Sequence, residues 1–283
     1  MKRQKCDNDI KKERDNGFTL VELLIAMAIA LVVITSISSA FIMQRKTYDV
    51  QEQIAEMTQN SRAAMDMLTS EIMMTGYGAP TSYITTWIDW VSVTMDSNPK
   101  IEDGGSGPDI IHMAACFDGS AGSLSAAASK GDTSITLGSG EGSAFNTDDK
   151  KVINIDRIEN AVVTGKSGDT LTIDTDPTTT GNQGLRNDYE IGDPVSVVKV
   201  ISYSIVQDPD GSYILKRNEN LGAGRQPLAE NIIDLQITQA GDTIEINPLT
   251  AQTDKPDPNY SQNNGYRTFS QRAYITPPNL LIK

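Results

Sequence analysis

Glu22 has the most unusual surroundings of any charged side chain, since it is the only charged residue between Phe18 and Met43. This run is 26 residues long. About twenty apolar residues at about 1.5 Å each cross the roughly 30 Å core of a bilayer. A carboxylate there costs about 2.5–3.5 kcal/mol near the centre and less near an interface. We therefore expect Glu22 to mark a functional site.

Gly17 stands directly before the apolar run and is the candidate site for peptide-bond cleavage. An ordinary secretory signal has an apolar core of roughly 7–15 residues, followed by a small-residue cleavage site. This run is longer than such a core, and no site of that kind closes it. Cleavage after Gly17 would keep the apolar helix on the mature chain, with Phe18 as its first residue.

The charges on either side of the run predict its orientation. Residues 1–17 carry six basic and four acidic side chains, a net charge of +2. Basic residues stay on the cytoplasmic side, so we expect the N-terminus inside and the bulk of the chain outside. The whole chain carries −13, and removing residues 1–17 would leave −15. Such an acidic product argues against direct binding to nucleic acid phosphates.

The segment Gly17-Phe18-Thr19-Leu20-Val21-Glu22-Leu23-Leu24-Ile25-Ala26 resembles the class III signal of type IV pilins and type II secretion pseudopilins. In that family a prepilin peptidase cuts after the Gly and methylates the new N-terminal amine, here that of Phe18. The family's Glu at the fifth mature position falls on Glu22. That side chain is thought to compensate the N-terminal amine of a neighbouring subunit. The resemblance implies an assembly subunit with no catalytic site, cofactor or metal.

Three later stretches, residues 44–52, 60–68 and 71–78, resemble PilW-type minor pilins. The resemblance implies insertion in the bacterial inner membrane with a cytoplasmic N-terminus and a periplasmic head, then transfer to a pilus on the cell surface. The implied role is priming or assembly of a type IV pilus, with a place at its tip. The implied partners are other minor and major pilins, the prepilin peptidase, the inner-membrane assembly platform and the bilayer. Two alternatives stay open: a J-type pseudopilin of type II secretion, and a tip adhesin that binds a ligand through an acidic insert.

Other chemistry-bearing residues are few. Cys6 would leave with residues 1–17, so the mature chain would hold Cys116 alone, without an intrachain disulfide. Cys116 follows an apolar stretch and is expected to be a buried small residue, with an intermolecular disulfide or a reactive thiol as the alternatives. The single His112 excludes a multi-His zinc cluster, and it is expected to be a strand residue. No Ser/His/Asp arrangement can be built around it from the sequence.

Three short motifs resemble ligand loops without their full pattern. Residues 165–167 (Gly-Lys-Ser) end like a phosphate loop, but Asn160 replaces its first Gly and no helix is expected after it. Residues 208–211 (Asp-Pro-Asp-Gly) match only part of a calcium loop and predict a turn. The acidic residues of the stretch 254–258 are expected to be solvated and not to bind a metal.

A long helix must position the N-terminal residues. No Gly or Pro occurs between Phe18 and Thr75. We expect a transmembrane half over 18–43 and an amphipathic half over 44–78, whose apolar stripe contains Ile54, Met57, Ala64, Met65, Leu68 and Ile72. The glycines and proline of 76–80 should end the helix.

The remaining residues, 79–283, predict a periplasmic or extracellular head of mainly antiparallel sheet, so the expected fold class is α+β. Short alternating runs over about 126–198 predict an inserted β subdomain, preceded by a linker or exposed loop over 119–129. A hairpin turn is expected at 165–168. Further strands are expected at 87–93, 109–113, 195–206, 213–217, 232–237, 243–246 and 267–275.

Overall fold

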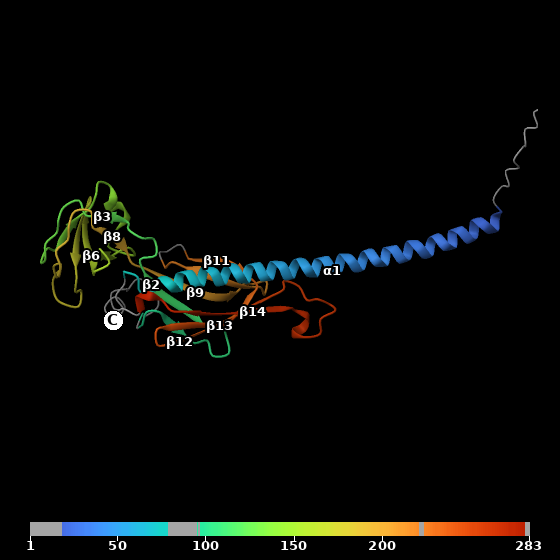
Figure 1. Ribbon diagram of the computed structural model, residues 1–283. Coiled ribbons are helices and arrows are strands. Elements are labelled where there is room, and N and C mark those ends of the chain that lie inside the picture. The colour runs from blue at the N-terminus through green and yellow to red at the C-terminus, as the bar shows by residue number, and fades with distance from the viewer. Residues whose placement is uncertain (1–18, 79–94, 96, 221–223, 281–283) are drawn as a thin grey trace, which may run out of the picture. The chain divides into compact units, whose positions relative to one another are not determined.

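The computed structural model describes residues 19–78, 95, 97–220 and 224–280. The chain consists of two compact units, residues 1–52 and 53–283. One helix, α1 (Leu20–Met74), runs without interruption from the first unit into the second. Figure 1 shows α1 as the long helix in blue and cyan. The predicted long helix is therefore confirmed, but it ends at Met74, and residues 75–78, expected in its amphipathic half, form a turn.

Two glycines end the helix as expected. Gly76 has φ +82° and Gly78 has φ +62°, and L side chains rarely adopt this left-handed region. The Gly76 N–H donates to the carbonyl of Ala114, which ties the helix end to a strand. A Cβ at Gly78 would lie 2.7 Å from the Cys116 sulfur. Gly78 thus provides both the left-handed backbone and the space for close packing.

Within the described residues, one sheet has five strands in the order β1-β2-β9-β10-β11 and another has the order β12-β13-β14. All their pairings are antiparallel. The bounds of the first sheet are β1 Lys100–Glu102, β2 Ile110–Ala115, β9 Lys199–Gln207, β10 Tyr213–Asn218 and β11 Arg225–Glu230. The bounds of the second sheet are β12 Ile232–Ala240, β13 Thr243–Gln252 and β14 Thr268–Ile275.

The C-terminal half of α1 shares one hydrophobic core with both sheets. Its buried positions are Met57, Ser61, Ala64, Met65, Leu68 and Ile72, which confirms the predicted stripe, with Ile54 partly buried beside it. The sheets contribute alternate residues such as Ile111, Tyr203 and Leu249. Figure 1 shows this part of α1 lying along the sheets. Burial of the large apolar side chains, at about 1.5–3 kcal/mol each, holds the helix on the head.

A third sheet has its own core. In the described chain its order is β3-β8-β5-β6-β7-β4, and its fifteen-residue buried cluster includes Phe145, Leu171 and Tyr189. The strands are β3 Gly122–Ser123, β4 Ser134–Thr136, β5 Val152–Ile155, β6 Glu159–Ser167, β7 Thr170–Asp174 and β8 Pro194–Val197. Among the described residues of the head, the short 3₁₀ helices are η2 Glu141–Ala144, η3 Asn263–Gly265 and η4 Pro278–Leu280.

Three sequence-based expectations about this region need correction. The stretch 119–129 is not only a loop, because β3 lies in it and Leu124 and Ala128 are buried in the third core. The hairpin turn lies at Gly168-Asp169, since β6 continues through residues 165–167 and Ser167 pairs with Thr170. The run 195–206 is two strands, because the chain passes from β8 in one sheet to β9 in another at residue 198.

The third sheet joins the rest of the head through a separate apolar cluster. Ala114, Cys116 and Met95 from one side meet Val152 and Val162 from the other. The Arg157 guanidinium also lies over the Tyr77 ring, 5.4 Å from its centroid. The third sheet is therefore held to the rest of the head by buried side chains as well as by the two segments through which the chain enters and leaves it.

The other expected strands correspond to β2, β10, β12, β13 and β14, while the one expected at 87–93 lies outside the described residues. The fold is α+β, with a long N-terminal helix and a mainly antiparallel head, as the sequence predicts.

Candidate functional site

Glu22 and Thr19 form a capping box at the first turn of α1. The Thr19 N–H donates to Glu22 Oε2 at 2.9 Å, and the Thr19 hydroxyl donates to the same oxygen at 3.0 Å. The Glu22 N–H donates back to Thr19 Oγ1 at 3.3 Å. These bonds satisfy backbone donors that the helix itself leaves without partners. Gly17 and Phe18 lie outside the described residues.

The apolar half of α1 has no protein cover in the described chain. Every side chain from Leu20 to Met43 is exposed, and the helix is long and apolar enough to cross a membrane. Its hydroxyl groups bond within the helix: Thr35 donates to the Leu31 carbonyl at 2.9 Å and Ser36 to the Val32 carbonyl at 2.8 Å. Such bonds make the hydroxyls compatible with an apolar surrounding.

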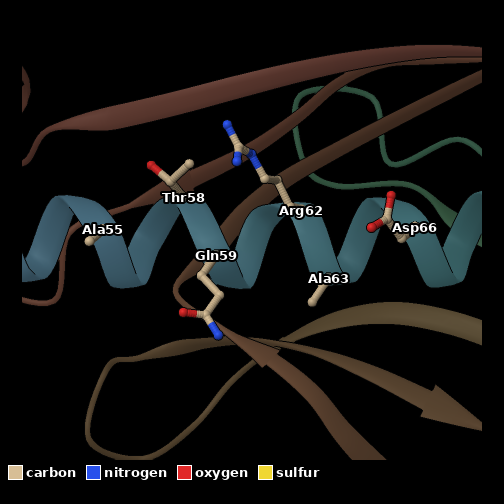
Figure 2. Close-up of a pocket in the computed structure, with 6 residues that line it drawn as sticks. All are labelled: Ala55, Thr58, Gln59, Arg62, Ala63 and Asp66. Carbon is tan, nitrogen blue, oxygen red and sulfur yellow. The ribbon is translucent and has the colours of Figure 1, made fainter.

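A groove runs along the solvent side of α1 in the second unit. Figure 2 shows that all its lining side chains come from this one helix. Arg62 and Asp66 are its charged groups, and its floor includes the small residues Ala55 and Ala63. These lining groups include no nucleophile beside a general base.

His112 and Ser202 come together in a way that the sequence did not indicate. His112 Nδ1 lies 2.7 Å from Ser202 Oγ across β2 and β9, and His112 Nε2 lies 3.6 Å from Glu102 Oε1. Both His112 and Ser202 are buried, and Ser202 Oγ also accepts a hydrogen bond from the Asn220 amide at 3.0 Å. A buried hydroxyl with two partners is not placed to attack a substrate. Burial, which outweighs the attraction of Glu102, lowers the pKa of His112. The expectation that His112 is a strand residue is confirmed.

Cys116 is buried, as the sequence predicts, with 1% of its surface exposed. Burial, with a smaller effect of the Asp118 charge, raises the pKa of its thiol to about 12. The thiol is therefore protonated near neutral pH and is a poor nucleophile.

One part of the acidic loop differs from the expectation of a solvated stretch. Asp257 is buried and accepts hydrogen bonds from Arg267 Nε at 3.0 Å and Nη2 at 2.7 Å. The Asn259 N–H and then Arg267 hold the pKa of Asp257 below its usual value. Among the described side chains, no group of three or more His, Cys, Asp or Glu could hold a metal ion.

Comparison with known proteins supplies the class. Residues 13–38 match the family model described as the prokaryotic N-terminal methylation motif. The motif indicates a type IV pilin-like or pseudopilin precursor that is processed by prepilin peptidase. Its presence points to a structural subunit that assembles with other pilins, and the apolar α1 fits an anchor in the inner membrane. No curated protein and no solved structure matched the chain.

Proposed function

We propose that this chain is a PilW-type minor pilin that takes part in priming or assembling a type IV pilus, with a place at the pilus tip. Prepilin peptidase cuts between Gly17 and Phe18 and methylates the Phe18 amine. The N-terminus is cytoplasmic and the head periplasmic until assembly carries the head to the cell surface. The resemblance of residues 44–78 to minor pilins supports the subtype.

The observation that carries the proposal is the position of Glu22. It is a lone carboxylate in the first turn of a 55-residue helix whose apolar half has no protein cover in the described chain. Removal of residues 1–17 would create a positive amine at Phe18, four residues away. In the assembled bundle, Glu22 pairs with that amine of a neighbouring subunit, and the attraction offsets the cost of both charges in an apolar surrounding.

The capping box adds a constraint on this pairing. Thr19 donates to only one carboxylate oxygen, Oε2. A carboxylate has about four acceptor positions, so the other oxygen can accept from a neighbouring amine while the cap is kept. Thr19 thus fixes the rotamer of Glu22, and the proposed partner takes the remaining oxygen.

Replacing Glu22 tests the proposal. Glu22→Val should be cleaved and inserted normally, because an apolar helix enters the membrane more easily without the acid. It should fail to enter complexes with other minor pilins, because the neighbouring amine has lost its partner. Cross-linking and co-purification from membranes measure this, and the length of the N-terminal segment is read by intact mass.

Thr19→Ala is the matched control. It removes the hydroxyl's part in the capping box, at a cost of about 1 kcal/mol to the helix, and keeps both the carboxylate and the backbone N–H that donates to it. We expect it to assemble, and Glu22→Asp to assemble less well because of its shorter reach. Normal incorporation of Glu22→Val would eliminate the charge-pairing mechanism, whereas the pilin assignment would still stand on the processing motif.

We also propose that residues 126–198 form the greater part of an inserted subdomain, which the third sheet and its separate core support. This subdomain carries the alternative function of a tip adhesin. Its acidic side chains outnumber its basic ones, which would favour a cationic ligand. A J-type pseudopilin of type II secretion is the second alternative. Co-purification with sheared pili favours the minor pilin over it.

A further inference from the structure

The edges of the three sheets are blocked by different devices, with one exception among the described strands. The edge strands β1 and β4 have three residues each and β3 has two. The edge strand β11 contains Pro227, which has no backbone N–H. Short edges and prolines of this kind prevent pairing with other chains.

The β12 edge is closed by a side chain. Asp109 Oδ2 accepts from the Ile237 N–H at 2.7 Å, and the Asp109 N–H donates to the Leu235 carbonyl at 2.7 Å. The Gln236 amide donates to the Gly107 carbonyl at 2.9 Å. The loop before β2 therefore uses the backbone groups that a further strand would need.

The exception is β14. It has eight residues without Pro or Gly, and the irregularity in its ladder lies on β13, between Ile246 and Leu249. In the described part of the chain, no backbone hydrogen bond joins the outer side of β14 to another segment. Its residues alternate between exposed and half-buried up to Ile275. A long, unbroken edge with free backbone groups is a template for one more strand.

The side chains of β14 leave this edge open. A charged side chain on an edge strand discourages pairing, and Arg272 is the charged residue of β14. Its Nε, however, lies 3.7 Å from Glu245 Oε1 on β13, which holds the guanidinium over the sheet. The Arg272 side chain is still 54% exposed. On the other face, Phe269 and Ala273 are only half-buried at the margin of the core, as is Ile54 of α1. The apolar side chains at this margin are therefore partly exposed and can contact another chain.

We propose that the outer edge of β14 binds an extended strand from another subunit. The backbone ladder supplies the affinity, and the side chains of β14 set the sequence that fits. Apolar residues of the added strand cover Phe269 and Ala273 on the helix side. A carboxylate on the solvent side pairs with Arg272, whose guanidinium remains accessible beside Glu245. The inference goes beyond the proposed function and does not depend on processing at Gly17 or on Glu22.

A synthetic peptide tests the strand site directly. The probe is a labelled eight-residue peptide that alternates Val and Thr, with Glu at the Thr position opposite Arg272. Its matched control has the same side chains but N-methyl groups on the amides that face β14. With the full chain in detergent micelles, fluorescence polarisation should show saturable binding of the probe. The control should bind about tenfold more weakly or worse, because it cannot form the backbone hydrogen bonds to β14.

Charge reversal tests the register. Arg272→Glu should weaken binding of the Glu peptide by about fivefold and strengthen that of a Lys peptide, while Arg272→Lys should keep most of the binding. Circular dichroism checks that the variants are folded. Hydrogen exchange gives an independent readout, because the outward amides of β14 should exchange rapidly in the free chain and slow down with the probe bound.

Two results would overturn the proposal. Equal binding of the N-methylated peptide would mean that no ladder forms. Slow exchange of every β14 amide in the free chain would mean that the chain's own residues already cover the edge.

Discussion

Glu71 forms polar contacts between α1 and the five-stranded sheet. Replacing it should show how much these contacts, as distinct from apolar burial, contribute to the stability of the head. Its carboxylate accepts from the Tyr203 hydroxyl at 2.6 Å and from Arg217 at 2.9 Å (Nε) and 2.8 Å (Nη2). The Glu71 side chain is 13% exposed and that of Arg217 is 17% exposed. Burial, followed by the hydrogen bond to Glu71, raises the pKa of Tyr203, so the hydroxyl remains a donor at neutral pH.

Glu71→Ala should lower the free energy of unfolding by about 2–3 kcal/mol. Breaking a fully buried ion pair costs about 3–5 kcal/mol, because a charge is left without its partner. Here the loss is smaller, since Arg217 keeps a second partner, Glu219, at 2.5 Å. Glu71→Gln keeps one acceptor oxygen, for Tyr203 or for Arg217, and places an amide NH2 where the other oxygen stood, so it should cost about 1 kcal/mol less than Glu71→Ala.

The assay is pulse proteolysis of the full chain in detergent across a urea gradient. Glu56→Ala is the control, because Glu56 lies on the same helix but is exposed, and it should change stability by less than about 0.5 kcal/mol. Tyr203→Phe completes a double-mutant cycle with Glu71→Ala, and we expect the two losses to be less than additive. A Glu71→Ala variant as stable as the Glu56→Ala control, or a Gln variant as unstable as the Ala variant, would refute the reasoning.

Two further predictions concern buried titratable groups. The pKa of His112 is lower in the folded chain than its ordinary 6.5, so the unfolded state binds a proton first as the pH falls. The free energy of unfolding should fall as the pH drops below about 6.5, by at most about 1.4 kcal/mol per pH unit. In His112→Gln this contribution is absent, so its urea midpoint should change less between pH 7 and pH 5.5 than that of the original chain. Cys116, with a thiol pKa of about 12, should hardly react with iodoacetamide at pH 8 in a Cys6→Ser background. Mass spectrometry should find it alkylated only after urea is added, whereas rapid labelling of the native chain would contradict its burial.

The sequence alone determined the features that depend on neighbouring residues. The absence of Gly and Pro between Phe18 and Thr75 set the length of α1, and the spacing of apolar side chains set its buried stripe. The capping box was not predicted, although a Thr three residues before a Glu at the start of an apolar run is a helix-start pattern that could have indicated it. The processing motif was readable, because it is a contiguous run of residues. Each of these features depends on residues that lie close together in the sequence.

Tertiary structure decided the features that depend on pairing between distant segments. Apolar residues continue through Val197, Val198 and Val200 without a Gly or Pro, so the sequence does not show that the chain changes sheets there. Asp257 stands in a polar stretch that predicts exposure, but Arg267, ten residues later, folds back and buries it. Ser202 meets His112 only because β9 and β2 pair in one register across 90 residues of chain. Register and sheet membership are set by the packing of whole cores, and a single sequence does not show that packing in its local pattern.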